Sequence, residues 1–234
     1  AARFVTGRHD DTRRRLLGVD GVHDVASVID AIVTHPEHDR FVAARVAREY
    51  VGAAGPEGQT TPAADVVDEI AEAYRAAERG LDAPIEHALR IVADPGPTDR
   101  HRPIVSAPIP WLVAATRTLG VDAIDTARGA RGRFQSMGQV PMYPPAVAGW
   151  PGEHRWLTTS ALVARTAVAA SIVAAAAPGE PTVAAAADGD LDRLAILLGL
   201  PEPFSPSTER ALRTASDPDG RLTLALVSPE YLLT

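Results

Sequence analysis

The chain of 234 residues contains no cysteine. This absence excludes disulfide bonds, a catalytic thiolate, and zinc or iron–sulfur sites that depend on cysteine ligands. Lysine is absent as well, so all 23 side chains of the Lys+Arg total are arginine, a usage that fits a GC-rich genome. Because 30 acidic residues outnumber them and the formal net charge is −7, nucleic acid is not an expected partner.

A long, uninterrupted apolar segment is also missing. The most apolar stretch, residues 161–177, is dominated by alanine and interrupted by Arg165, whereas a transmembrane helix needs about 20 predominantly apolar residues. We interpret this stretch as a buried helix and expect no membrane span. The first residues show no signal-peptide pattern, so the sequence leaves open whether the protein is cytoplasmic or exported.

Over most of the chain, hydrophobic residues recur at helical spacing. Helix starts are marked by capping residues or by proline: Asp24, Pro36, Pro62, Pro84, and Thr158 or Thr159. No alternation of period two stands out, and residues 1–22 and 178–189 are predicted to be loops. The pattern indicates an all-α protein, an irregular bundle of about nine or ten helices.

One long segment, from Met137 to Trp156, departs from this pattern; we call it the Gly-Trp loop. Its four prolines prevent a helix from running through it. It also carries three large aromatic residues, Tyr143, Trp150 and Trp156. Aromatic rings in a loop of this length either fasten the loop to a core or line a ligand pocket. We expect the helices to be arranged around this loop.

The loop residues also resemble a known family. The run Met137-Gly-Gln-x-x-x-Tyr-Pro-Pro-x-Val-x-Gly-Trp-Pro-Gly, with Trp156-Leu and Leu162-x-x-Arg after it, is similar to the signature loop of the bacterial domain-of-unknown-function family 1800. His35-Pro, Ser106-Ala-Pro-Ile and Ser228-Pro-Glu-Tyr resemble other segments of that family, in the same order. Ala146 and Ala148 stand where the family usually has Asn and Lys.

This resemblance covers nearly all of the chain, but it implies no particular activity. Members of the family are longer, so it implies that residues 1–234 are a single all-α domain, the C-terminal part of a longer family domain. Possible sub-lobes are residues 1–104 and 105–234.

The Gly-Trp loop holds the main candidate site. Tyr143, Trp150 and Trp156 beside Arg155 provide the aromatic faces and the cation of a pocket for a carbohydrate or another small molecule. The neighbouring residues Glu153 and His154 could supply an acid–base group. The same aromatic rings would serve equally well to fasten the loop to the core.

Two histidine pairs are further candidates. His9 and Asp10 could form an acid–base or metal pair, since a carboxylate can orient an imidazole, or simply make local hydrogen bonds in a loop. His35 and His38 lie three residues apart at the start of a helix, where they could share a metal ion, but no third ligand is evident. We therefore expect no metal and no cofactor.

Motifs for dinucleotide binding, phosphate binding or a nucleophilic serine are absent. The sequence therefore favours a binding or assembly module, which acts with a protein partner or with an N-terminal region of its own family domain. The alternative is a hydrolase or transferase with a pocket beside the Gly-Trp loop.

Overall fold

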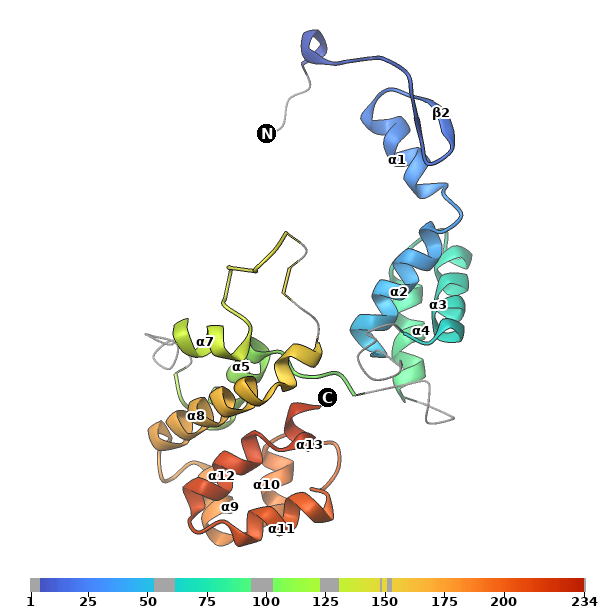
Figure 1. Cartoon of the computed structure of the whole chain (residues 1–234). Helices are drawn as coiled ribbons and strands as arrows, with labels where there is room; N and C mark the ends of the chain where they lie inside the picture. The colour runs from blue at the N-terminus through green and yellow to red at the C-terminus, as the bar shows by residue number, and fades with distance from the viewer. Residues whose placement is uncertain are drawn as a thin grey trace. The chain divides into compact units, whose positions relative to one another are not determined.

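The computed structural model describes residues 5–52, 62–93, 103–122, 131–147, 149–150 and 153–233, except for the side chains of residues 6, 153 and 154. The chain divides into two compact units, Ala1–Arg102 and Pro103–Thr234 (Figure 1). We describe each unit by itself. Whether the two units together make up one domain of residues 1–234 remains a prediction.

Unit 1 begins with a short 3-10 helix, η1 (Thr6–Arg8), and an antiparallel hairpin of β1 (Arg14–Leu16) and β2 (Val19–Val22). The prediction of a loop over residues 1–22 is therefore wrong. Leu17 and Gly18 turn the chain with φ of 51° and 83°, the geometry that two-residue hairpin turns require. Strands of three and four residues are too short to show an alternating pattern in the sequence.

The first helix of the chain, α1 (Val25–Val33), starts where the sequence predicts it. The Asp24 carboxylate accepts a hydrogen bond from the amide of Ser27 at 2.8 Å, and Ser27 Oγ accepts one from the amide of Asp24 at 3.0 Å. This reciprocal capping box satisfies two amide groups that a helix start leaves without partners. Asp24 is confirmed as the cap of this helix.

The described part of unit 1 holds three further helices: α2 (His38–Tyr50), α3 (Ala64–Ala76) and α4 (Asp82–Ala93). Their buried apolar residues form one hydrophobic cluster, with Ala43, Val51, Val66, Ile70 and Ala88 among its members. An ion-pair cluster on this helix group joins Asp39 of α2, which is 6% exposed, to Arg75 and Arg79 at 3.1 and 2.9 Å.

Unit 2 holds the remaining helices that the structure describes. They are α5 (Pro108–Thr118), α7 (Arg131–Met137), the 3-10 helix η2 (Glu153–Leu157), α8 (Thr159–Ala175), α9 (Pro181–Asp188), α10 (Leu191–Leu197), α11 (Pro206–Thr214), α12 (Pro218–Leu226) and α13 (Pro229–Leu232). Thr158 caps α8 by accepting a hydrogen bond from the amide of Ala161, as the sequence predicts.

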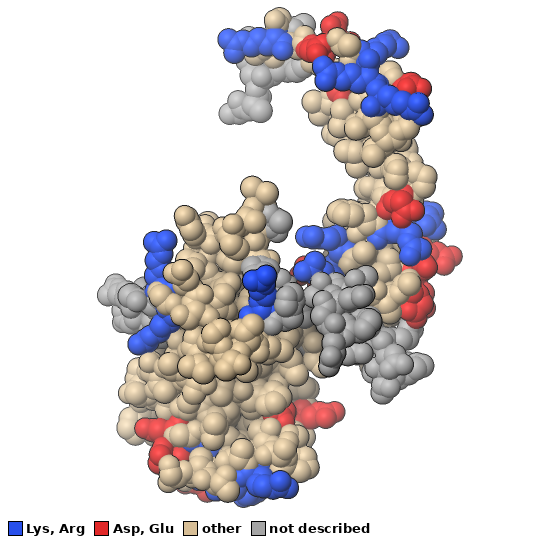
Figure 2. Space-filling view, viewed as in Figure 1, with Lys and Arg blue, Asp and Glu red and all other residues tan. Residues whose placement is uncertain are grey.

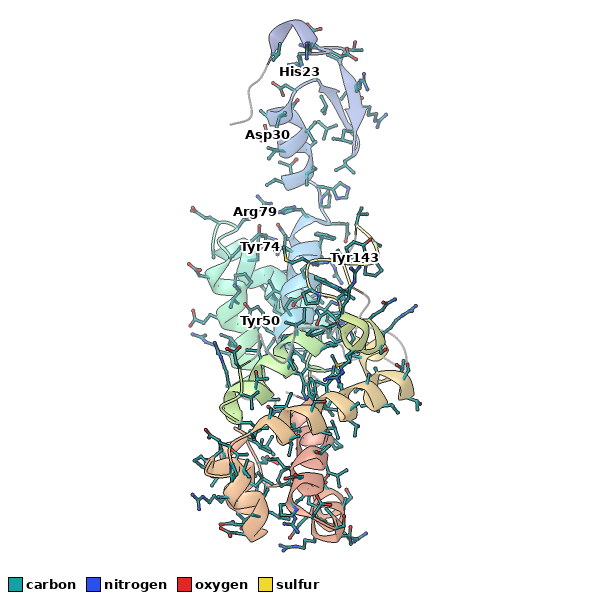
Figure 3. All side chains as sticks on the ribbon, turned by 90° about the vertical axis from the view of Figure 1, so that its left-hand side faces the viewer. His23, Asp30, Tyr50, Tyr74, Arg79 and Tyr143 are labelled. Atoms are coloured by element: carbon teal, nitrogen blue, oxygen red, sulfur yellow. The ribbon has the colours of Figure 1, made fainter. Side chains whose placement is uncertain are left out.

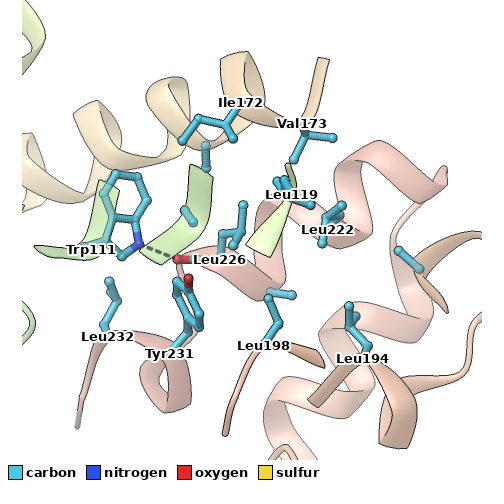
Figure 4. Close-up of a cluster of buried hydrophobic side chains, with 14 of the residues drawn as sticks. Trp111, Leu119, Ile172, Val173, Leu194, Leu198, Leu222, Leu226, Tyr231 and Leu232 are labelled. Atoms are coloured by element: carbon cyan, nitrogen blue, oxygen red, sulfur yellow. Dashed lines mark hydrogen bonds between the residues drawn. The ribbon is translucent and has the colours of Figure 1, made fainter. Parts of the chain in front are cut away.

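The core of unit 2 surrounds Trp111 of α5 (Figure 4). Its indole Nε1 donates to the carbonyl of Leu226 at 2.8 Å, which ties α5 to α12. The guanidinium of Arg165 from α8 lies over the ring of Trp111, with Cζ 5.3 Å from the ring centroid. Arg165 is fully buried, its Nη2 donates to the carbonyl of Ser106 at 2.7 Å, and burial lowers its pKa to about 10.

The all-α class is confirmed, with the small hairpin as its one sheet among the described residues. These residues already contain twelve α-helices, more than the nine or ten expected. The predicted loop over 178–189 is wrong, because Pro181 starts α9 and Gly189, with φ of 72°, ends it. Within the described ranges, none of the helices is long and apolar enough to cross a membrane.

The Gly-Trp loop is not the centre around which unit 2 packs. The core is formed mainly by helix residues around Trp111, with Met137 at the start of the loop among them, whereas loop residues 141–147 are all exposed. Proline and positive-φ residues keep this segment out of regular structure, so it cannot pair its backbone groups inside a core. The loop is instead fixed at its base.

Candidate ligand-binding site

The Gly-Trp loop leaves the helices at the end of α7. Gly138 has φ of 87°, and the amides of Gly138 and Gln139 donate back to Gln135 and Phe134 at 3.1 and 3.0 Å. Glycine ends helices in this way because it adopts positive φ without strain. The buried side chain of Gln139 then accepts a hydrogen bond from the amide of Ile109 at 2.9 Å, which fastens the base of the loop to the start of α5.

Trp156 supports the loop base from the other side. A Cβ atom added to Gly138 would lie 3.5 Å from Cδ1 of Trp156, so the indole packs directly against the glycine backbone. The ring is half-buried, and its Nε1 is sealed from solvent and has no hydrogen-bond partner among the residues that the structure describes. Trp156 therefore fastens the loop to the unit, which is the structural role that the sequence left open for it.

Beyond this base, the tip of the loop stands out from the unit. Met142 is 93% exposed and Val147 is fully exposed. Tyr143 lies on the same stretch, above α7 and α8 (Figure 3), and is 67% exposed. The amide of Gly149 donates to the carbonyl of Ala146 at 3.0 Å and closes the turn.

A hollow of about 530 Å³ lies between this loop, α7 and the start of α8. Three of the four predicted ligand-binding residues line it: Tyr143, Trp150 and Arg155. The other described lining residues are Arg131, Gln135, Ser136, Gly138, Val140, Pro145, Thr158 and Ser160. We call this the loop hollow. Its volume suits a small ligand.

The charge of the loop hollow is positive. Arg131 and Arg155 line it, and its described lining contains no carboxylate and no histidine. The guanidinium of Arg131 lies over the ring of Tyr143, with Cζ 5.5 Å from the centroid; such a contact is worth about 0.5–1 kcal/mol at an exposed site. A second hollow of about 450 Å³ shares Arg131 and Tyr143, so this pair stands between two depressions.

The hydroxyl groups of the loop hollow are engaged in helix ends and helix turns. Ser136 donates to the carbonyl of Gly132 at 2.9 Å. Thr158 caps α8, and its Oγ1 lies 3.2 Å from the hydroxyl of Ser160. By contrast, the indole Nε1 of Trp150 is sealed from solvent and has no acceptor in the part of the chain that the structure describes. The side chains of Gln135 and Tyr143 also line this wall, and each can donate or accept a hydrogen bond.

The comparison with protein families decides what the chain belongs to. The family model described as protein of unknown function (DUF1800) matches residues 1–233. The chain is a member of this family. The resemblance of the Gly-Trp loop is thus confirmed, and the match extends over essentially the whole chain, not only over a C-terminal portion. The search of curated proteins and the search of solved structures found no match.

The other predicted site residues of this DUF1800 chain either belong to unit 1 or have side chains outside the described set. Glu153 and His154 belong to η2, but their side chains lie outside the described residues. His9 and Asp10 are in unit 1, where Asp10 accepts hydrogen bonds from the amide of Thr12 and the guanidinium of Arg14. The hydrogen bonds from Thr12 contribute most to lowering the pKa of Asp10, to about 2.

The second histidine pair is engaged locally. Nδ1 of His35 accepts a hydrogen bond from the amide of Glu37 at 3.2 Å. Nε2 of His38 lies 3.5 Å from the hydroxyl of Tyr74, and the neighbouring Asp39 is paired with two arginines. In the described ranges, no group of three or more His, Cys, Asp or Glu residues is placed to hold a metal ion.

Sequence reasoning did not find the contribution of α7 and α8 to the loop hollow in this DUF1800 member. Arg131 and Gln135 are four residues apart on α7, so they lie on one face of the helix. That spacing is visible in the sequence, but the side of the helix that faces the loop is not. Ser136 and the pair Thr158 and Ser160 carry no signal beyond that of ordinary helix residues.

Proposed function

We propose that this protein is a binding module that holds a small molecule in the loop hollow, with a ring of the ligand against Tyr143 and Trp150. The observation that carries the proposal is the shared location of Tyr143, Trp150 and Arg155, which come from separate positions of the Gly-Trp loop and line one hollow. Aromatic faces next to a few polar groups are typical of small-molecule sites.

The geometry favours binding over catalysis. A hydrolase or transferase needs an acid–base group within hydrogen-bond reach of the reacting atom, and the described lining offers neither a carboxylate nor an imidazole. The hydroxyls of Ser136 and Thr158 are engaged in α7 and α8, and the described lining offers no base that would activate either as a nucleophile.

An assembly role, in which a protein partner contacts the loop, is a second candidate, and the exposed tip favours it. Met142 and Val147 are the two most exposed large apolar side chains of the described residues. Exposed apolar groups that gather on one protruding segment are a common feature of interaction sites. In this reading the tip contacts the partner while the loop hollow stays free for its ligand.

The test of ligand binding uses phenyl β-D-glucoside, a neutral probe that carries both an aromatic ring and a sugar. Its binding is measured by the change in tryptophan emission. We expect saturable binding to the wild-type chain, and about fivefold weaker binding to Tyr143→Ala because a stacking contact of roughly 1 kcal/mol is lost.

Val147→Ala is the matched control, because Val147 is on the same loop but lines neither hollow. It should bind the probe as the wild type does. Absence of saturation in the wild type, or equal affinity of Tyr143→Ala and the wild type, contradicts the proposed function.

A further inference from the structure

The loop hollow gathers positive charge that the described carboxylates do not balance. Neither Arg131 nor Arg155 forms an ion pair with a described carboxylate, and both guanidinium groups line the hollow. Figure 2 shows the same imbalance at the surface: the visible face around α7 carries basic side chains and no acidic ones. In a chain with a formal net charge of −7, this local excess of cations is a specific feature of the site.

The donors of this hollow come from separate segments. Arg131 is on α7, Arg155 is in η2, and Trp150 is in the loop between them. Each guanidinium presents five N–H donors and cannot accept a hydrogen bond. The indole Nε1 of Trp150 has no acceptor among the described residues but is sealed from solvent, so the two guanidinium groups are the cationic donors that a ligand can reach. The described lining is therefore rich in donors, while Gln135 and the hydroxyl groups can also accept.

We propose that the ligand of the loop hollow is a small phosphate or sulfate monoester whose oxyanion lies between Arg131 and Arg155. This inference rests on the proposed function and adds the chemical class of the ligand. A tetrahedral oxyanion offers three acceptor oxygens in different directions, which suits guanidinium donors that come from two separate segments. A carboxylate offers two oxygens in one plane. The organic part of the ester stacks on Tyr143, whose ring already lies under the guanidinium of Arg131.

Arg133 provides a matched control for charge. It lies on the same short helix as Arg131, but its Nη1 is 3.3 Å from the hydroxyl of Ser171 on α8 and it does not line the loop hollow. Arg133→Gln therefore removes one positive charge from α7 without removing a donor from the hollow. Any effect of net charge alone would be equal in Arg131→Gln and Arg133→Gln.

The experiment compares five probes at constant ionic strength, set with chloride: phenyl phosphate, phenyl sulfate, inorganic phosphate, benzoate and phenyl β-D-glucoside. Binding is followed by tryptophan emission and by the thermal midpoint of unfolding. We expect phenyl phosphate to bind at least about tenfold more tightly than the neutral glucoside or benzoate, and inorganic phosphate to bind more weakly than its phenyl ester.

The variants locate the anion. Arg131→Gln and Arg155→Gln should each weaken phenyl phosphate about tenfold or more, since each removes charge-assisted hydrogen bonds. Both should weaken the glucoside less than they weaken phenyl phosphate, and Arg133→Gln should leave every probe unchanged.

Equal binding of phenyl phosphate and the glucoside contradicts the proposal that the ligand carries an oxyanion, but it leaves the proposed function standing. The oxyanion is also overturned if Arg133→Gln weakens phenyl phosphate as much as Arg131→Gln does. If inorganic phosphate binds as tightly as the phenyl ester and the glucoside does not bind, the hollow binds an anion but no aromatic ring. The proposal of a monoester ligand is then wrong. If no probe binds, both proposals fail.

Discussion

At the scale of single residues, the loop hollow shows which side chains a sequence can identify. Tyr143 and Trp150 stood out because large aromatic residues are rare in this chain, and Arg155 because it lies beside them. Arg131 did not stand out, since one arginine among 23 basic residues carries no signal. Its role comes from a contact with Tyr143 that depends on how α7 faces the loop, which is a matter of tertiary packing.

The buried carboxylate of Asp39 leads to a prediction about acid stability. Its hydrogen bonds, first of all the one from Arg79, hold its pKa below the ordinary value. A carboxyl group whose folded pKa is depressed stabilises the fold above its unfolded pKa, and this contribution is lost as the pH falls through the folded pKa. Asp39→Asn should therefore destabilise unit 1 by about 1–3 kcal/mol at neutral pH, the range for charged hydrogen bonds.

Urea unfolding followed by circular dichroism and tyrosine emission measures this change, at neutral pH and again below pH 4. The difference between Asp39→Asn and the wild type should shrink in acid. Asp68→Asn is the control, because Asp68 pairs with Arg40 at an exposed position, where an ion pair contributes about 0–1 kcal/mol. A pH-independent difference for Asp39→Asn would contradict the assigned role of its charge.

At the scale of elements, long helices with caps were predicted well and short elements were not. Asp24 and Thr158 mark the starts of α1 and α8 because capping is a local interaction, written in three or four consecutive residues. The β1–β2 hairpin and α9 were missed. The hairpin has too few residues to show a period, and the alanines of α9 give no contrast between an apolar face and a polar one.

Two glycines at opposite ends of α7 should respond in opposite ways to the same substitution. At Gly132, a Cβ atom would meet no other atom within 4 Å, so Gly132→Ala should stabilise unit 2 by roughly 0.5–1 kcal/mol through helix propensity. At Gly138, φ is 87°, a left-handed backbone conformation in which an L side chain is strained, so Gly138→Ala should destabilise unit 2 by about 1–2 kcal/mol.

Chemical denaturation followed by tryptophan emission gives both free energies. The sign difference is the decisive result, since the two variants have the same composition. Equal effects of the two substitutions would mean that the turn at Gly138 does not need a left-handed residue. The structure of the loop base would then be wrong.

At the scale of the whole molecule, each hydrophobic cluster draws its members from one unit. The cluster of α2, α3 and α4 lies within residues 43–92, and the cluster around Trp111 lies within residues 109–232. The sequence suggested this division through possible sub-lobes that meet at residues 104 and 105, close to the boundary between Arg102 and Pro103. It could not assign the core of unit 2 to Trp111, because the partner of that indole is 115 residues away.

The hydrophobic cluster around Trp111 draws all its members from unit 2. We therefore expect the fragment 103–234 to fold without unit 1. We expect it to unfold cooperatively on heating, with a near-ultraviolet circular dichroism signal from its packed aromatic residues. Trp111→Ala in the same fragment should remove the cooperative transition, since loss of a buried tryptophan costs about 3–5 kcal/mol. A fragment that is helical but lacks the near-ultraviolet signal would contradict the independence of this unit.

The contrast between the fixed base and the exposed tip of the Gly-Trp loop has a chemical consequence. The chain has two methionines. Met137, at the base of the loop, is 1% exposed, and Met142, at its tip, is 93% exposed. Thioether oxidation follows access to the sulfur, so mild peroxide will convert Met142 to its sulfoxide and spare Met137. Isotope labels on the methyl groups of the two methionines would likewise give two nuclear magnetic resonance signals. Met137 would report on the interior of unit 2, and Met142, five residues later, on the tip of the loop.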